Sequence, residues 1–217
     1  MPPDLDSVIF SWVMAQQDEP RRDEPERRID QRRIDRSVDA AGVTIAEPDG
    51  TDGPHLWRLA RDSGVLDMNS SYAYLLWCRD FAGTSAVARV DGTVVGFVTG
   101  FVRPEAPDTV MVWQVAVDAG QRGRNLAGRM LHAIIDRLSP QGVRWLHTTV
   151  SPSNEASIRL FTALARDRGI EIERRELFAP EDFPTEEPGG HEAEDLYVIG
   201  PFPPVATPTR EAIGVNQ

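Results

Sequence analysis

Residues 113–135, WQVAVDAGQRGRNLAGRMLHAII, constrain the fold of this chain more than any other stretch. An alternating apolar segment over 110–117 predicts a strand, and a helix with one apolar face is predicted over 123–138, directly after a turn rich in glycine and arginine. A helix start presents unpaired backbone N–H groups and the positive end of the helix dipole. The turn therefore predicts a phosphate-binding site. An ordinary strand-to-helix turn with solvated arginines is the alternative.

The rest of the apolar pattern alternates between helical and strand periods and predicts one mixed α/β sheet. Asp91-Gly92 between two apolar runs is the strongest hairpin signal of the chain. Asn69 or Ser70 can cap the second helix. The expected helices cover 53–63, 72–81, 123–138 and 153–168. The expected strands cover 43–46, 85–90, 94–102, 110–117, 144–150, 170–175 and 196–200.

The charge of the chain divides it into three parts. The 217 residues carry a formal charge of −11, yet residues 41–169 are balanced, with 13 basic and 13 acidic side chains. Residues 1–40 contain a mixed-charge block with few apolar side chains, which cannot offset the entropy cost of ordering. A short charged helix after Pro25 is the alternative there. We expect a disordered tail over 1–40, one folded domain over 41–202 and a flexible proline-rich tail over 203–217.

Composition also excludes several classes of protein. The negative charge opposes binding to nucleic acid phosphates, and no stretch reaches the roughly 20 apolar residues of a membrane-spanning helix. The apolar run over 8–15 follows Asp4 and Asp6, whereas a signal peptide begins with positive charge, so we expect a cytoplasmic protein. A single cysteine, Cys78, within a predicted helix, indicates a buried structural thiol rather than a nucleophile. The four histidines share no metal-ligand spacing, so no metal is expected.

The sequence VAVDAGQRGRNLAGRML resembles the acyl-CoA pyrophosphate loop of the GNAT superfamily of N-acetyltransferases, which follows the pattern Q/R-x-x-G-x-G/A after a strand. Asn125 stands where the first motif glycine usually stands, and asparagine tolerates positive φ better than most other residues. The resemblance implies a mostly antiparallel central sheet flanked by helices, with acetyl-CoA as co-substrate. The residues it places at the pyrophosphate are Arg122, Gly123, Arg124, Asn125, Leu126 and Ala127.

The same resemblance assigns further cofactor contacts. The strands over 110–117 and 144–150 would splay apart, and the main chain of Val115 and Val117 would hydrogen-bond the pantetheine arm. Asn154 matches a cofactor-contacting asparagine of the family, with local capping as the alternative.

One residue departs from the family pattern. Many members carry a tyrosine, as general acid, seven residues after that asparagine, where this chain has Phe161. A thiol with a pKa of about 8.5 leaves without a strong acid. Tyr72 or Tyr74 could replace the missing tyrosine, and packing is the alternative role for both.

Four segments, LDMNSSYAYLLWCRDF, VMVWQVAV, TTVSPSNEASIRLF and HEAEDLYVIGPF, are similar to one subfamily, the L-2,4-diaminobutyrate acetyltransferases of ectoine synthesis. This resemblance covers roughly residues 43–202. It implies acetyl transfer to the 4-amino group of L-2,4-diaminobutyrate by a homodimer. A GNAT enzyme for another small amine is the first alternative, and a non-catalytic acyl-CoA-binding module is the second.

A substrate with two amines and one carboxylate calls for a pocket with more acidic than basic groups. We expect Asp67 and Glu155 to recognise the amines, and either carboxylate could take the proton that the amine must lose. A carboxylate that only stabilises a helix start is the alternative for both. Tyr72 is the third candidate catalytic residue. The expected substrate contacts are Asp67, Asn69, Tyr72, Trp113, Gln114, Thr149 and Glu155.

Overall fold

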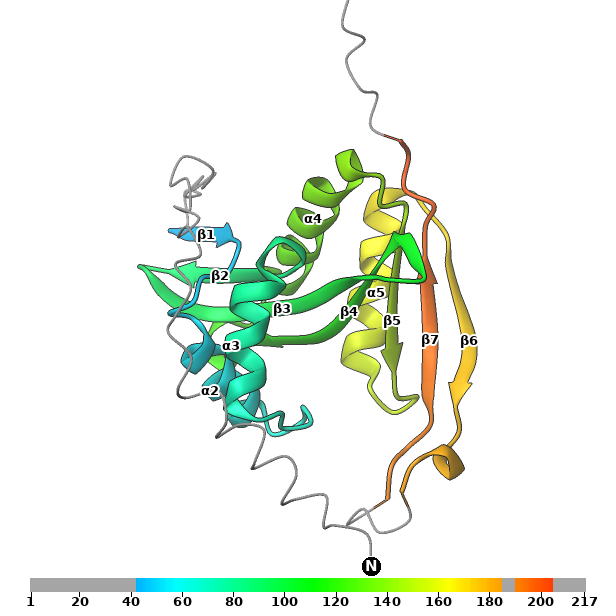
Figure 1. Ribbon diagram of the computed structural model, residues 1–217, viewed down its shortest axis with the longest axis horizontal. Coiled ribbons are helices and arrows are strands. Elements are labelled where there is room, and N and C mark those ends of the chain that lie inside the picture. Colours follow the sequence, from blue (N-terminus) through cyan, green and yellow to red (C-terminus); the bar gives the residue numbers. More distant parts are fainter. Residues whose placement is uncertain (1–41, 185–189, 205–217) are drawn as a thin grey trace, which may run out of the picture. The chain divides into compact units, whose positions relative to one another are not determined.

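The computed structural model describes residues 42–184 and 190–204 (Figure 1). The predicted tails, 1–40 and 203–217, lie outside these residues apart from 203 and 204. The strands are β1 (Val43–Ala46), β2 (Ala86–Val90), β3 (Thr93–Arg103), β4 (Ala106–Val117), β5 (Trp145–Val150), β6 (Ile172–Phe178) and β7 (Glu194–Ile199). The α-helices are α2 (Gly53–Ser63), α3 (Ser71–Asp80), α4 (Leu126–Leu138) and α5 (Glu155–Arg168). Short 3₁₀ turns, which the sequence did not predict, lie at Ala82–Thr84, Ala119–Gln121, Ser139–Gln141 and Pro180–Asp182.

The seven described strands form one sheet in the order β1-β2-β3-β4-β5-β7-β6. Every pair is antiparallel except β4 and β5, which are parallel. The predicted hairpin between β2 and β3 is confirmed, because Asp91 and Gly92 both have positive φ, 48° and 80°, as a two-residue turn requires. The prediction of a mixed, mostly antiparallel α/β fold is therefore confirmed.

The sheet buries a separate core on each face. Helices α4 and α5 pack on one face through residues such as Met130, Ile134 and Phe161, together with the strand residue Leu146. Helices α2 and α3 pack on the other face, where Tyr74 lies with its ring edge against Phe97. We call these the α4/α5-side core and the α2/α3-side core. Figure 1 shows that α2 and α3 lie beside the β1–β4 half of the sheet, away from β6 and β7.

An arginine at the end of α5 joins the two helices of the larger core. The Nε of Arg168 donates to Nδ1 of His132 on α4 at 2.8 Å, and its Nη1 forms an ion pair with Asp136 at 2.8 Å. Burial, followed by the nearby Arg168 charge, holds the pKa of His132 below its ordinary value. The neutral imidazole is the form that fits this contact, because it can accept the guanidinium hydrogen bond.

We therefore expect the free energy of unfolding to fall as pH falls from about 8 to about 5.5. A histidine with a depressed pKa in the folded state binds fewer protons there than in the unfolded chain, so its stabilisation is present at high pH and is lost on acidification. The substitution His132→Asn keeps an acceptor for Arg168 but does not titrate, so it should flatten the pH dependence. Urea unfolding across this pH range measures how steeply the free energy of unfolding depends on pH. Equal slopes for His132→Asn and wild type would contradict the attribution of this dependence to His132.

Candidate active site

Strands β4 and β5 separate partway along their length and open one end of the sheet. Their parallel pairing runs from Thr109–Trp145 to Val112–Thr148 and stops there. Beyond that point β4 continues to Val117 beside β3, and β5 continues to Val150 beside β7. The splay implied by the family resemblance is thus present in the described chain.

The main chain of β4 faces this opening at alternate residues. The amides of Gln114 and Asp118 donate toward β3. Peptide groups alternate in direction along a strand, so those of Val115 and Val117 are directed away from β3, toward the opening. Their backbone groups are therefore suitably placed to pair with an extended amide-containing ligand.

The turn after β4 ends in left-handed backbone rather than in the first turn of a helix. Gly123 has φ 79° and Asn125 has φ 52°, so α4 begins at Leu126, and the prediction of a helix from residue 123 was wrong. Asparagine is among the residues that accept this conformation at least cost. Gly128 gives the Asn125 side chain its space, because a Cβ there would lie 2.5 Å from Oδ1 of Asn125.

The residues expected at the pyrophosphate surround this helix start. Arg122 is exposed, and Nη1 of Arg124 donates to Oε1 of Gln121 at 2.5 Å. Leu126 is buried in the α4/α5-side core, so only its main chain can face a ligand. The half-buried Ala127 follows it. The backbone N–H groups of a helix N-terminus, together with arginine side chains, are groups that can bind a diphosphate.

Asn154 caps the second helix at this end of the sheet. Its Oδ1 accepts a hydrogen bond from the Ser157 amide at 3.1 Å, and α5 begins at Glu155 rather than at the expected residue 153. The capping role is therefore present. The side-chain nitrogen of Asn154 is a separate group, which a ligand contact would use.

A β-bulge on β4 determines which side chains face α3. Thr99 pairs with Gln114 and Gly100 pairs with Val112, so Trp113 is one extra residue on β4. Because of this insertion, Trp113 and Gln114 both lie on the α3 side of the sheet. The Trp113 ring lies 6.4 Å from that of Trp77 on α3 and is 54% exposed.

Gln114 uses both ends of its side-chain amide inside the protein. Its Oε1 accepts from the Tyr74 hydroxyl at 3.0 Å, and its Nε2 donates to the main-chain oxygen of Asp67 at 2.9 Å. The side chain is almost fully buried, with 7% of the residue exposed. The structure thus brings Gln114 and Asp67 together, as expected, but through the Asp67 main chain.

Apart from Glu155, the other expected substrate residues lie on three segments. Asp67 and the half-buried Asn69 belong to the loop 64–70 between α2 and α3, and Tyr72, 64% exposed, lies in the first turn of α3. Ser70, one of the two predicted caps, accepts from the Ala73 amide. Thr149 lies on β5 just past the last residue paired with β4.

Glu155 opens α5, directly after the turn that follows β5. Its side chain is 78% exposed and pairs with Arg159 at 2.8 Å, one helical turn further on. The predicted carboxylate is therefore at a helix N-terminus, where the dipole favours it. The contact with Arg159 would have to loosen before Glu155 could receive an amine.

Two glutamates that the sequence did not single out individually meet this same turn. The Ser151 hydroxyl donates to Glu194 at 2.7 Å, and the Ser153 hydroxyl donates to Glu192 at 2.9 Å. The start of β7 is thereby fixed against the segment that joins β5 to α5. The acidic sequence HEAED is the one signal that could have indicated their presence at the site.

Of the two tyrosines that could replace the missing general acid, Tyr72 is exposed, whereas Tyr74 lies in the protein interior, as do Phe161 and Cys78. Phe161 is buried in the α4/α5-side core, and Tyr74 is fully buried in the α2/α3-side core. Cys78 is buried on α3, and burial raises the pKa of its thiol to about 12. A nucleophilic thiolate needs the opposite shift.

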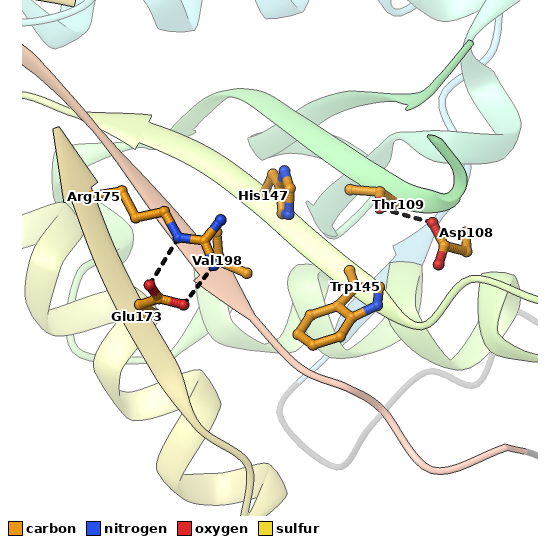
Figure 2. A pocket seen from close by; sticks show the side chains of 7 residues that line it. All are labelled: Asp108, Thr109, Trp145, His147, Glu173, Arg175 and Val198. Carbon is orange, nitrogen blue, oxygen red and sulfur yellow. Dashed lines mark hydrogen bonds and ion pairs between the residues drawn. The ribbon is translucent and has the colours of Figure 1, made fainter. Parts of the chain in front are cut away.

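A separate cavity of about 290 Å³ lies over the paired part of β4 and β5 (Figure 2). Trp145 and His147 of β5 line it, and so do Arg175 and Glu173 of β6, which form an ion pair. Burial, with Arg103 and Arg175 nearby, lowers the pKa of His147. The cavity adjoins the segment where β4 and β5 are still hydrogen-bonded, so it is distinct from the splay.

None of the described helices is long and apolar enough to cross a membrane. Within residues 42–184 and 190–204, no three His, Cys, Asp or Glu side chains gather as a metal ion would need.

Comparison with known proteins agrees with the geometry. Residues 54–165 match the acetyltransferase (GNAT) family. The L-2,4-diaminobutyric acid acetyltransferase of Streptomyces avermitilis is 57% identical over 163 residues, which are 74% of this chain and 89% of that protein. The enzyme of the same name from Nocardia farcinica is 54% identical over 151 residues, which are 70% of this chain and 76% of that protein.

A solved structure extends the agreement to the backbone. Diaminobutyrate acetyltransferase from Paenibacillus lautus, in complex with its substrate L-2,4-diaminobutyric acid and coenzyme A, superposes with a TM-score of 0.70. It is 40% identical, and the match covers 76% of this chain and 98% of that one. The splayed sheet, the turn before α4 and these similarities place the chain in the GNAT family of acetyltransferases.

Proposed function

We propose that this protein transfers the acetyl group of acetyl-CoA to the 4-amino group of L-2,4-diaminobutyrate, giving N4-acetyl-L-2,4-diaminobutyrate on the path to ectoine. The observation that carries the proposal is the opening between β4 and β5, with the left-handed turn and the start of α4 at its end. The 40% identity to a structure that holds both diaminobutyric acid and coenzyme A supports this choice of substrates.

Acetyl-CoA would lie in the opening. Arg122, Gly123, Arg124 and Asn125 would hold its pyrophosphate with the amides of Leu126 and Ala127. Val115 and Val117 would pair with its amide-containing arm, and Asn154 would contact it from the start of α5. The bound cofactor supplies an activated acetyl thioester.

The acceptor would lie on the α3 side of the opening. An alkyl amine has a pKa of about 10 and must lose a proton before it can attack a thioester. Asp67 would bind the ammonium ion, and Asp67 or Glu155 would assist its deprotonation. Asn69, Tyr72, Trp113 and Thr149 would orient the rest of the molecule. Assembly as a homodimer and a cytoplasmic location remain predictions.

An acceptor panel tests the proposal. With acetyl-CoA, kcat/KM for diaminobutyrate should exceed that for ornithine and lysine by about ten- to two-hundredfold for each added methylene, as a fitted pocket discriminates. Mass spectrometry and NMR of the product should place the acetyl group on the 4-nitrogen. Equal rates with the three amines would favour a GNAT enzyme for another amine, and binding of CoA without turnover would favour the non-catalytic module.

A further inference from the structure

We infer that Tyr74 and Gln114 are positioning residues, which hold the loop 64–70 and its Asp67 in place at the acceptor site. Gln114 acts in this way instead of contacting the substrate directly. The inference deepens the proposed function and rests on it. It gives Gln114 a role other than the expected substrate contact, because each polar end of that side chain has a hydrogen-bond partner within the protein and only 7% of the residue is exposed.

The loop 64–70 is held at its two ends and in its middle. At one end, the Ser63 hydroxyl accepts from the amides of Val65 and Leu66, each at 3.3 Å. At the other end, Ser70 caps α3. Between them, the 2.9 Å hydrogen bond from Gln114 fixes the main chain of Asp67 to β4. The position of the Asp67 carboxylate therefore depends on the bond that Gln114 makes.

Gln114 is in turn oriented by two buried hydroxyls. The Tyr74 hydroxyl donates to its Oε1, and its backbone amide donates to Oγ1 of Thr99 at 3.2 Å. Tyr74 and Thr99 are both fully buried. The Asp67 carbonyl can only accept a hydrogen bond, so it requires Nε2 at its end of the Gln114 amide and leaves Oε1 to accept from the Tyr74 hydroxyl. A buried network in which each member is satisfied specifies one geometry.

The bulge makes this arrangement possible. In regular alternation, Gln114 would face α4, on the side opposite Trp113. The extra residue at Trp113 turns Gln114 back to the α3 side, so the strand that borders the cofactor opening also fixes the acceptor loop. One short segment of β4 thereby sets the distance between acetyl donor and amine.

The test compares Tyr74→Phe with Tyr197→Phe. Both remove one hydroxyl from a buried tyrosine, and Tyr197 lies in the α4/α5-side core. Tyr74→Phe should raise the KM for diaminobutyrate about three- to tenfold, as expected for one buried hydrogen bond. Its kcat and its KM for acetyl-CoA should stay within about twofold. Tyr197→Phe should leave the KM for diaminobutyrate unchanged even if it lowers the melting temperature.

Two further variants separate positioning from packing. Gln114→Glu still accepts from Tyr74 but cannot donate to Asp67, so it should raise the acceptor KM at least as much as Tyr74→Phe. In a Gln114→Ala background, Tyr74→Phe should add no further increase, because Tyr74 acts through Gln114. Additive increases in KM, or an equal rise in the KM for acetyl-CoA, would overturn the inference.

Hydrogen exchange gives a readout that needs no acceptor. Amides of the loop 64–70 should exchange faster in Tyr74→Phe and Gln114→Ala than in wild type, and Tyr197→Phe should leave them unchanged. Unchanged exchange in all variants would overturn the positioning role. If wild type were inactive with diaminobutyrate but loop exchange behaved as described, the proposed substrate would fail while the positioning role survived.

Discussion

Replacement of Asp67 by Asn should lower kcat/KM for diaminobutyrate about ten- to a hundredfold, the cost of losing a hydrogen bond between charged groups. The Asp67 carboxylate is exposed on a loop whose main chain is fixed to β4, so it can reach an ammonium ion without leaving a buried charge behind. The amide keeps the shape of the side chain and removes its charge. The acetyl-CoA dissociation constant should stay within about twofold, because the cofactor turn is a separate part of the site.

The matched control is Asp62→Asn, which changes another exposed carboxylate close in sequence. Asp62 pairs with Arg61 on α2, and neither residue belongs to the loop 64–70. Steady-state kinetics with diaminobutyrate should be unchanged in this control. If Asp67→Asn weakened acetyl-CoA binding as much as it weakened the use of diaminobutyrate, the division of the site into acceptor and cofactor parts would be refuted.

The turn before α4 gives the second large effect. Asn125→Val places a β-branched residue at φ 52°, where such side chains are strained, so the backbone must move. The amides at the start of α4 then lose their alignment, and we expect the KM for acetyl-CoA to rise about tenfold or more, as strain of about 1–3 kcal/mol implies. The KM for diaminobutyrate should change much less.

Asn125→Gly is the matched control at the same position. Glycine adopts positive φ at no steric cost and restores the usual motif residue. The KM for acetyl-CoA in this variant should equal that of wild type or fall below it. A large rise with glycine would show that the Asn125 side chain, and not the backbone conformation, is what the cofactor site needs.

The sequence predicted the order of the helices and strands, because most of them carry a helical or an alternating apolar period. Helix α2 and strand β1 have the bounds expected from that period. The mostly exposed β6 ends three residues later than expected, and β4 begins four residues earlier. The predicted helix starts are wrong where a local backbone conformation delays the first helical turn. Gly123 and Asn125 delay α4 by three residues, and Asn154 delays α5 by capping it. A periodic pattern carries no information about such backbone angles.

The candidate site was harder to predict, because its contacts join distant parts of the chain. The motif around Asn125 is local in sequence, so the turn before α4 could be proposed as the cofactor site from the sequence alone. Tyr74 and Gln114 are 40 positions apart, and the bulge that turns Gln114 toward Tyr74 has no signature in the residues 111–117. The contacts of Ser151 with Glu194 and of Ser153 with Glu192 span similar separations, 43 and 39 positions.

The most direct test of the proposed acetyl transfer is a crystal structure of the protein with CoA and L-2,4-diaminobutyrate bound together. The pyrophosphate should lie at residues 122–127 and the pantetheine arm beside Val115 and Val117. The 4-amino group should lie on the α3 side of the opening, within reach of the Asp67 carboxylate. Diaminobutyrate bound instead in the cavity over Trp145 and His147, or CoA bound away from the turn before α4, would contradict the account.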